Sequence, residues 1–443
     1  MQRYSRGREL HDRCAVAAAL IQFSMLGAGM IVIQAAAQSQ PALNTIYAFT
    51  GGADGAGPIG IVRGRNGVFY GSTVGGGASG DGTVFQLTPP AVAGGAWTET
   101  VLYSFTGQNG TGTGPVATPT LGPLERLFGT TYSGGASGWG IAFELTPPPP
   151  AGGIWKESVL YNFPAVVDGT QVLAGLVIGP NGALYGTTWN GGAYDRGTAY
   201  ELAPSGGGWT ETTLYSFGGS SGDGSGPATS MVVGPDGAFY GTTAAGGTRG
   251  YGTVFELAPP TTPGGAWTET VLYSFTGPDG YKPAAPLVFG SNGVLYGTTE
   301  EGGVPCITIA GCGVVFSLAP PTTPGGAWTE SVLYRFMGGS SDGALPKAGV
   351  VLGPNGSLLG TNLNGGTGPC YYLDSAVGCG SAFMLTPPTM PGSPWIETIL
   401  HFFTRGQDGG EPGAMVRATD GALYGVTGIG GTGQAGTIFH LKL

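Results

Sequence analysis

The stretch VIGPNGALYGTTWNGGAYDRGTAYELAPSGGGWTETTLYSF, at Val177–Phe217, contains the pattern that decides the fold. It divides into four short runs of apolar and β-branched residues, separated by clusters of Gly, Pro and Asn, as β-strands are separated by turns. The first two runs flank Asn-Gly, the strongest short hairpin signal, because a tight primed turn needs positive φ at both central residues. The stretch therefore predicts one unit of four short strands.

The same unit recurs along the chain. The mark of its second strand, Tyr-Gly or a close variant, occurs seven times at intervals of 55 to 65 residues: Tyr70, Phe128, Tyr185, Tyr240, Tyr296, Leu359 and Tyr424. The third strand also occurs seven times and ends with GTIFHL at Gly436–Leu441. The fourth strand, led by tryptophan, occurs only six times, starting at Trp97, Trp155, Trp209, Trp267, Trp328 and Trp395. The missing seventh copy is the opening stretch LNTIYAF, Leu43–Phe49.

A repeat divided between the two ends of the chain predicts a closed ring. Repeated four-stranded units suit the blades of a β-propeller. A first strand that completes the last blade also leaves no open sheet edge, whereas a linear solenoid has no reason to split a repeat. We therefore expect an all-β, seven-bladed propeller of antiparallel blades over residues 38–443, with blades at about 58–106, 114–164, 171–217, 226–276, 283–337, 346–404 and 412–443 plus 43–50.

The pattern LYGTTxxGGxxGxGTVFxLxP…WTETVLYSF resembles the GloVer (Gloeo/Verruco-type) tandem-repeat family of secreted bacterial proteins, and the resemblance covers Leu43–Leu443. The pattern is also kelch-like, with Gly-Gly after the second strand and Trp before the fourth. Blade 2 departs from it, because GPLERLFGTT at Gly122–Thr131 replaces the GPNGxLYGTT turn. The resemblance implies an extracellular setting and carries over no activity.

The N-terminal residues have the layout of a secretory signal. Four arginines precede an apolar run, Cys14–Ala37, that closes with three alanines. An uncleaved membrane anchor is the alternative, but polar residues within the run favour cleavage. We expect a signal peptide at residues 1–37 and a secreted, monomeric mature protein without a membrane span.

The charge balance excludes one class of partner. Without residues 1–37 the chain keeps 12 basic and 24 acidic side chains, a net charge of −12, against −10 for the whole sequence. Binding to a phosphate backbone requires clustered Lys and Arg, and four Lys and eight Arg spread over the mature chain form no cluster. Nucleic acid is therefore not expected as a partner.

Two loops between the second and third strands stand out. In five blades four residues, ASGD, ASGW, AYDR, TRGY or TGQA, separate the Gly-Gly from the next glycine. Blades 5 and 6 carry the longer insertions VPCITIAGC and TGPCYYLDSAVGC. Paired cysteines in local loops of an exported chain predict the disulfides Cys306–Cys312 and Cys370–Cys379. Zinc is the rival, but these spacings are not those of zinc sites, and only two histidines follow residue 37.

The insertion of blade 6 suggests a ligand-binding lip. A loop closed by a disulfide would hold Tyr371, Tyr372 and Asp374 and would lose little entropy on binding. Aromatic side chains beside an acid suit stacking on sugar rings. We extend this candidate site to Asp342 and Asp408 in the connections that follow blades 5 and 6. The alternative is that the disulfides only restrain two long loops and the tyrosines pack locally.

Two acids recur in most repeats. An Asp-Gly pair in the blade-to-blade connections is weakly suggestive of calcium, a cation that prefers several oxygen ligands, but Asp-Gly also builds turns; the candidates are Asp54, Asp168, Asp223, Asp279, Asp342 and Asp408. The Glu of the WTET motif is expected to place charge on an edge strand, which discourages aggregation, rather than to catalyse a reaction; its copies are Glu99, Glu157, Glu211, Glu269, Glu330 and Glu397.

Together these features predict an extracellular binding module, with a carbohydrate or a surface protein as partner and no required cofactor. A glycan-active lyase or hydrolase is the second hypothesis, and a purely structural repeat protein is the third. No Ser–His–Asp set or metal-ligand pattern selects an enzyme class.

Overall fold

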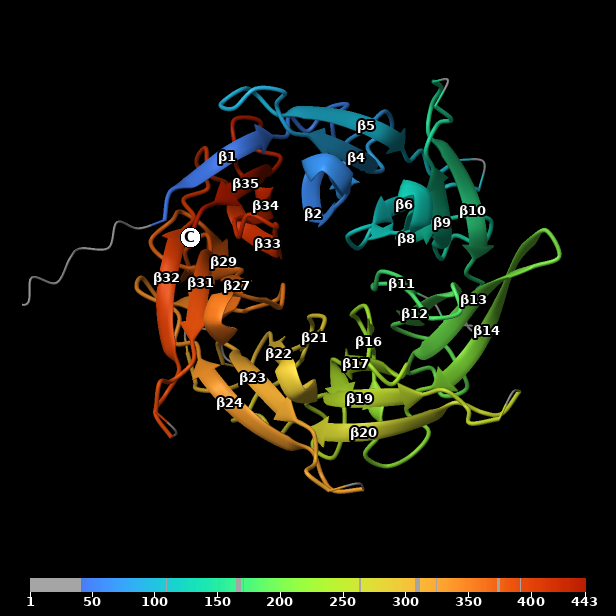
Figure 1. Ribbon diagram of the computed structural model, residues 1–443, viewed down its shortest axis with the longest axis vertical. Coiled ribbons are helices and arrows are strands. Elements are labelled where there is room, and N and C mark those ends of the chain that lie inside the picture. The colour runs from blue at the N-terminus through green and yellow to red at the C-terminus, as the bar shows by residue number, and fades with distance from the viewer. Residues whose placement is uncertain are drawn as a thin grey trace, which may run out of the picture. The chain divides into compact units, whose positions relative to one another are not determined.

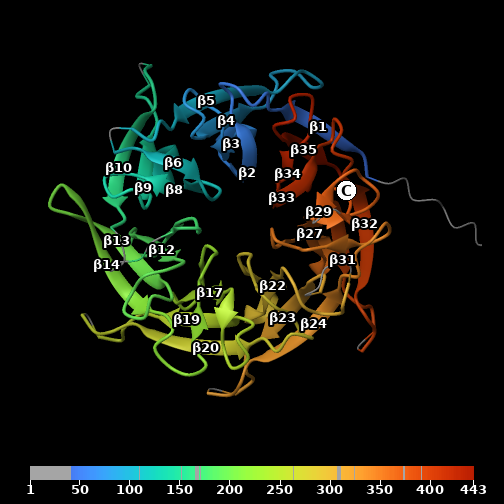
Figure 2. The ribbon, with the colours of Figure 1, turned by 180° about the vertical axis from the view of Figure 1, so that it is seen from behind.

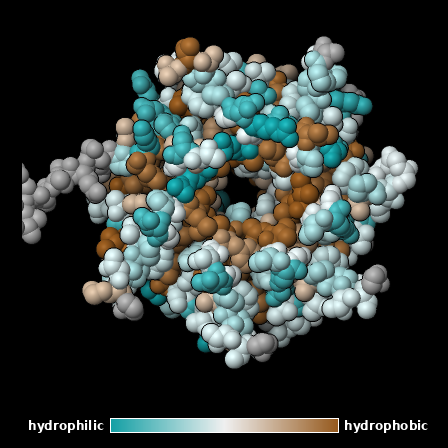
Figure 3. Space-filling view, in the orientation of Figure 1, coloured by the Kyte–Doolittle hydropathy of each residue, from teal (hydrophilic) through white to brown (hydrophobic). Residues whose placement is uncertain are grey.

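The computed structural model describes residues 41–443 except 109, 151, 165–168, 170, 263, 307–310, 324, 373–374 and 391. The residues Gln40–Leu443 form one compact unit. Its described residues make seven antiparallel sheets arranged as blades in a ring, which Figures 1 and 2 show from the two sides. The space-filling view in Figure 3 shows a hollow at the centre of the ring, here the central channel. The predicted all-β propeller with seven blades is confirmed. None of the described helices is long and apolar enough to cross a membrane.

In each blade the strands follow one another from the channel to the rim. Blade 1 comprises β2 (Ala56–Arg63), β3 (Phe69–Gly75), β4 (Thr83–Thr88) and β5 (Thr98–Ser104). Blade 2 comprises β6 (Gly112–Pro115) with β7 (Thr120–Leu121), then β8 (Leu127–Gly134), β9 (Ile141–Thr146) and β10 (Lys156–Asn162). Blade 3 comprises β11 (Val177–Ile178), β12 (Leu184–Thr188), β13 (Thr198–Ser205) and β14 (Gly208–Ser216). Blade 4 comprises β16 (Val232–Val233), β17 (Phe239–Thr243), β19 (Thr253–Ala258) and β20 (Thr268–Ser274).

The remaining blades repeat this order. Blade 5 comprises β21 (Val288–Phe289), β22 (Leu295–Thr299), β23 (Val314–Ala319) and β24 (Thr329–Arg335). Blade 6 comprises β26 (Val350–Leu352), β27 (Leu358–Asn362), β31 (Ser381–Thr386) and β32 (Ile396–Phe402). Blade 7 comprises β33 (Gly410–Arg417), β34 (Leu423–Ile429), β35 (Thr437–Leu441) and β1 (Leu43–Ala48). Short two-stranded ribbons join β15 (Gly224–Ser225) to β18 (Ala245–Gly246), β25 (Gly343–Ala344) to β28 (Asn364–Gly365), and β29 (Tyr371–Tyr372) to β30 (Ser375–Ala376).

The ring closes as the split repeat predicts. Strand β1 pairs antiparallel with β35, from Leu43 opposite Leu441 to Ala48 opposite Thr437. The N-terminal strand thus covers the edge that blade 7 would otherwise leave open.

Adjacent blades are joined by an aromatic contact that recurs at all seven interfaces. The aromatic residue that directly follows each fourth strand meets one on the third strand of the next blade, with ring centroids 5.0 to 5.3 Å apart. Such pairs contribute about 0.5–1.5 kcal/mol beyond the burial of their surface. They are Phe49–Phe85, Phe105–Phe143, Phe163–Tyr200, Phe217–Phe255, Phe275–Phe316, Phe336–Phe383 and Phe403–Phe439.

The glycine of the Tyr-Gly mark makes room for this aromatic ring. A Cβ on Gly71 would lie 2.3 Å from Cζ of Phe85, and one on Gly241 would lie 2.6 Å from Cζ of Phe255. No side chain fits at those distances, so the glycine is a packing requirement of each blade.

The Asn-Gly turns take two forms. Asn66 and Gly67 both have positive φ, at 53° and 77°, as a primed turn requires. In the Val177–Phe217 repeat only Gly182 does, at 79°, and there the prediction of positive φ at both positions is wrong. Its Asn181 instead closes the turn with its side chain, because Oδ1 accepts a hydrogen bond from the Ala183 N–H at 3.1 Å.

Candidate ligand-binding face

Both predicted disulfides are present. Cys306 is bonded to Cys312 and Cys370 to Cys379. Three of the four cysteines are buried, so the bonds lie under the loops rather than on their surface: Cys312, Cys370 and Cys379. Two disulfides are consistent with an extracellular protein.

The structure describes the proposed lip of blade 6 only in part. Tyr371 is 69% exposed and lies in β29, where it pairs with Ala376 of β30. The backbone of Tyr372 belongs to the same ribbon. Asp374 lies outside the described residues.

The aspartates of the blade connections hold their own turns. In every described copy both carboxylate oxygens accept hydrogen bonds from nearby N–H or O–H groups, and one oxygen also contacts a tyrosine hydroxyl or a histidine nitrogen of the preceding strand. These copies are Asp54, Asp223, Asp279, Asp342 and Asp408, whereas Asp168 lies outside the described residues. No group of three or more possible metal ligands occurs in the described part of the chain. This geometry supports turn building as the role of these carboxylates.

The glutamates of the WTET motif are not solvent-facing edge charges. Glu99 is half-buried against Tyr47 and Asp54 of the neighbouring blade, and burial together with the Asp54 charge raises its pKa to about 7. Glu269 stands in the same relation to Tyr215 and Asp223, with the same effect on its pKa. Five of these glutamates bury an Oε1 atom without a hydrogen-bond partner: Glu99, Glu157, Glu269, Glu330 and Glu397.

One face of the ring combines a constant backbone with changing side chains. We call it the loop face, because it carries the loops between second and third strands and the blade-to-blade connections. One residue stands just before the glycine that precedes each third strand, and in six blades its carbonyl oxygen accepts an N–H from the next connection at 2.8–3.0 Å. The seven residues at this position are Asp81, Trp139, Arg196, Tyr251, Cys312, Cys379 and Ala435.

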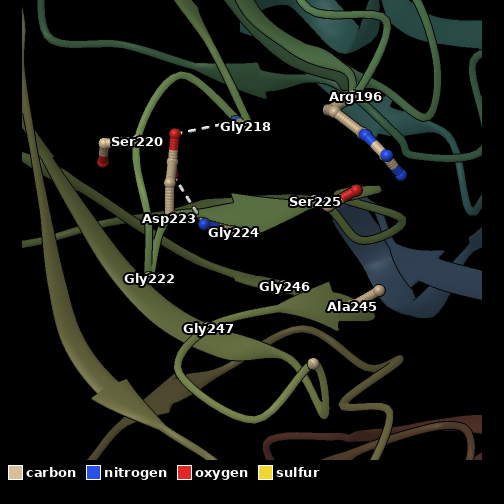
Figure 4. Close-up of a pocket in the computed structure, with 11 residues that line it drawn as sticks. Arg196, Gly218, Ser220, Gly222, Asp223, Gly224, Ser225, Ala245, Gly246 and Gly247 are labelled. Carbon is tan, nitrogen blue, oxygen red and sulfur yellow. Dashed lines mark hydrogen bonds between the residues drawn. The ribbon is translucent and has the colours of Figure 1, made fainter.

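At blades 3 and 4 this position opens onto a notch of about 410 Å³, here the Arg196 notch. Its walls are the connection from Gly218 to Ser225 and the blade 4 loop from Ala245 to Gly250. Figure 4 shows the Arg196 side chain on the same side of the notch as Ser225 and Ala245. The Asp223 carboxylate lies on the other side and points toward Gly218 and Gly224.

At blades 4 and 5 the equivalent space is a groove of about 320 Å³, here the Tyr251 groove. Tyr251 and Tyr281 meet edge to face, with centroids 5.2 Å apart and an interplanar angle of 73°. Glycines 277, 302, 303 and 311 form much of the remaining surface, and Val304 and Pro305 of the stapled blade 5 loop complete it.

Beside the groove, Lys282 occupies a left-handed backbone position, with φ 58°, where blades 1, 2 and 4 have glycine. Its ammonium group pairs with Glu300 at 2.9 Å and with Glu301 at 3.6 Å. Such a conformation costs a residue with a side chain about 1–2 kcal/mol. Blade 5 therefore keeps a strained, charged residue at the rim of the groove.

At the corresponding positions of blades 5 to 7 the side chain is buried rather than exposed. Cys312 packs on Ala344 and Leu345, Cys379 packs near Phe403, and Ala435 packs near Phe49; each of these three side chains is buried. Sequence reasoning placed the best candidate site on blades 5 to 7 because of the insertions. The two spaces described above lie on blades 3 to 5, so the preference for blades 5 to 7 stays a prediction; an alignment of the seven loops at their last residue would have pointed to Arg196 and Tyr251.

The profile of the Gloeobacter/Verrucomicrobia repeat family matches residues 127–373, more than half of the chain. The chain belongs to this family. The match confirms the resemblance expected from the repeat pattern. For this member of the Gloeobacter/Verrucomicrobia repeat family, no curated protein matches.

Solved structures are similar to this family member at low sequence identity. The extracellular domain described as part of a hybrid two-component system of B. thetaiotaomicron is 11% identical with a TM-score of 0.52; the match covers 90% of this chain and 39% of that one. The chain thus spans well under half the length of that protein's structure. A Dyadobacter fermentans protein of unknown function is 10% identical, with a TM-score of 0.43 and coverage of 91% and 99%. Trypanosoma rangeli sialidase in complex with sialic acid is 10% identical, with a TM-score of 0.41 and coverage of 91% and 59%.

Proposed function

We propose that this protein is an extracellular binding module that holds a carbohydrate in the Tyr251 groove of its loop face. The observation that carries the proposal is the aromatic pair of Tyr251 and Tyr281 over glycine-lined walls. Sugar rings present flat apolar faces edged by hydroxyl groups, and aromatic side chains with a polar tip suit such ligands.

The surroundings of the groove favour binding. The Tyr251 ring lies against Gly277, where a Cβ would be 3.5 Å from Cε2, so the backbone of this glycine supports the ring. Tyr251 is 38% exposed and is therefore available to a ligand. The disulfide Cys306–Cys312 restrains the opposite wall, which reduces the entropy lost when a ligand binds.

The groove also has a polar edge. Lys282, Glu300 and Glu301 form one ion-paired group close to Tyr281, whose N–H and carbonyl exchange hydrogen bonds with Glu301 at 2.8 and 3.0 Å. These groups would orient the hydroxyls of a sugar. We retain exposed Tyr371 of blade 6 as a secondary contact for a longer ligand.

The test is a thermal-shift panel of neutral and acidic oligosaccharides on the secreted protein, followed by calorimetry on any binder. A ligand at a hundred times its dissociation constant stabilises the folded state by about 2.7 kcal/mol. We expect Tyr251→Ala and Tyr281→Ala each to weaken binding at least tenfold. Tyr132→Ala, which removes an exposed tyrosine of blade 2, is the matched control and should leave the affinity unchanged.

Two results would overturn the proposal. One is a panel without any binder on protein that is folded and disulfide-bonded, which would turn attention to surface proteins as partners. The other is a carbohydrate whose affinity is the same in Tyr251→Ala, Tyr281→Ala and the parent protein.

A further inference from the structure

The Arg196 notch and the Tyr251 groove are neighbours that share one loop. Residues Ala245, Gly246, Gly247 and Gly250 of blade 4 line the notch, and the next residue, Tyr251, lines the groove. A chain of linked sugars that occupies the groove would therefore meet the notch with its next residues.

Arg196 places a positive charge at this notch. Its stem lies against Gly218, where a Cβ would be 2.5 Å from Cγ of Arg196. Among the described residues the ion pairs are those of Arg126, Lys282 and His401, and none involves Arg196. The guanidinium group is exposed and its planar fork fits a carboxylate with two parallel hydrogen bonds.

The acid nearest to the notch does not neutralise Arg196. Asp223 is 6% exposed, and its oxygens accept the N–H groups of Gly218, Gly219 and Gly224 and the hydroxyl of Tyr215. Asp195 precedes Arg196, but its Oδ1 accepts the Gly191 N–H at 3.0 Å. Both carboxylates are therefore engaged by the scaffold.

Two aromatic rings and a second cation lie beside the segments that form the walls of the notch. The Tyr194 ring lies over Gly219, where a Cβ would be 2.7 Å from Cε2, and the Trp189 ring lies 3.3 Å from such an atom on Gly226. Arg249, in the shared loop, is exposed and also takes part in no ion pair of the described residues. Two unpaired arginines on adjacent loops stand out in a chain with net charge −10.

We propose that the Arg196 notch is an anionic subsite continuous with the Tyr251 groove, and that the ligand is an acidic oligosaccharide whose ring carboxylate binds Arg196 while a neighbouring ring stacks on Tyr251. This inference rests on the proposed carbohydrate function and specifies its ligand class as hexuronate-containing glycans. Tyr194 and Trp189 flank the charged sugar, and Arg249 adds attraction along the shared loop.

The experiment compares trigalacturonate with its fully methyl-esterified form by calorimetry at low salt. The two probes differ in charge and share ring shape, so they isolate the carboxylate. We expect trigalacturonate to bind at least tenfold more tightly than the ester, and Arg196→Gln to remove that preference while leaving affinity for the ester within twofold. Lys156→Gln, at the exposed first position of outer strand β10, changes the net charge equally and should preserve the preference.

The outcomes separate this inference from the proposed function. Equal affinity for acid and ester, or an acid preference unchanged in Arg196→Gln, would overturn the anionic subsite; loss of binding in Tyr251→Ala would then leave the carbohydrate function standing. If neither probe binds while neutral sugars of the thermal-shift panel do bind, the anionic subsite is also overturned. No binding of any oligosaccharide would overturn both.

Discussion

Tyr215 donates its phenolic hydrogen to Oδ2 of Asp223 across 2.9 Å, and this bond ties the outer strand of blade 3 to the turn that leads into blade 4. The same carboxylate accepts the Gly218 N–H at 2.7 Å and the Gly224 N–H at 2.6 Å. Equivalent bonds join Tyr47 to Asp54 and Tyr334 to Asp342. The repeated Asp-Gly pair is thus a structural device that fixes each connection on the loop face.

Asp223→Ala should destabilise the protein by about 3 kcal/mol, because it leaves buried backbone N–H groups without acceptors, and each such loss costs about 1–3 kcal/mol. Tyr215→Phe, which removes one hydrogen bond and keeps the ring, should cost about 1 kcal/mol. Urea denaturation followed by tyrosine and tryptophan fluorescence measures both. Stabilisation by added CaCl2 that Asp223→Ala abolishes would instead favour a calcium role for these carboxylates.

Stability should fall as the pH rises from about 4.5 to 8. Burial, with the charge of the adjacent aspartate, raises the pKa of Glu99, Glu269 and Glu330 from 4.5 to about 7, and that of Glu397 to about 8. The unfolded chain releases these protons near pH 4.5, whereas the folded protein keeps them, so the folded state binds more protons between these values. The stabilisation is present below the unfolded pKa and is lost as the pH passes the folded pKa.

Melting temperatures between pH 4 and 9 test this dependence. The parent protein should melt at progressively lower temperature between about pH 4.5 and 8, and Glu269→Gln should flatten the decline because the amide does not ionise. Glu411→Gln, at an exposed position of the loop face, is the control and should retain the parent slope. A melting temperature that is constant or rises over this range would contradict the argument.

Leu124→Asn should stabilise the protein by about 1 kcal/mol, since a left-handed conformation penalises residues with an apolar side chain and Asn tolerates it. Leu124 has φ 58°, is 77% exposed and stands where other blades have the Asn of Asn-Gly. Equilibrium urea unfolding gives the free energy. Leu124→Ala serves as the control: an equal gain from alanine would mean that removal of the exposed leucine, rather than relief of the backbone, is responsible.

Phe49→Ala should destabilise the ring as strongly as Phe105→Ala, by about 3–5 kcal/mol each, because both fill the same fully buried position between blades. Phe49 contacts Phe85 and Phe105 contacts Phe143, at 5.2 and 5.1 Å between centroids. Comparing the unfolding free energies of the two variants measures how much the closure strand contributes. A much smaller effect at Phe49 would show that stability does not depend on docking of the N-terminal strand.

The repeat pattern alone was sufficient to predict the propeller. Strand β1, which Phe49 follows, and β35 come from opposite ends of the chain and pair in one blade, and only a closed ring brings them together. The Tyr-Gly mark likewise encodes contact within a blade, because the glycine at 71 and the ring at 85 face each other in neighbouring strands. Local pairing of this kind follows from sequence, since strand order within a repeat fixes which residues are opposite.

Contacts between blades could not be predicted from the order of strands within a repeat. The proximity of Glu269 to Asp223, and hence its raised pKa, depends on how two sheets pack, so a glutamate that the pattern places on an edge strand is half-buried in the structure. In the same way, the space beside Arg196 exists because three loops from two blades leave it unfilled, while a disulfide fills the equivalent space beside Cys312. The sequence by itself determined the blades, their number, the closure and the disulfides. Only the tertiary structure decided where the loop face is open, because that depends on the volumes of side chains brought together from separate repeats.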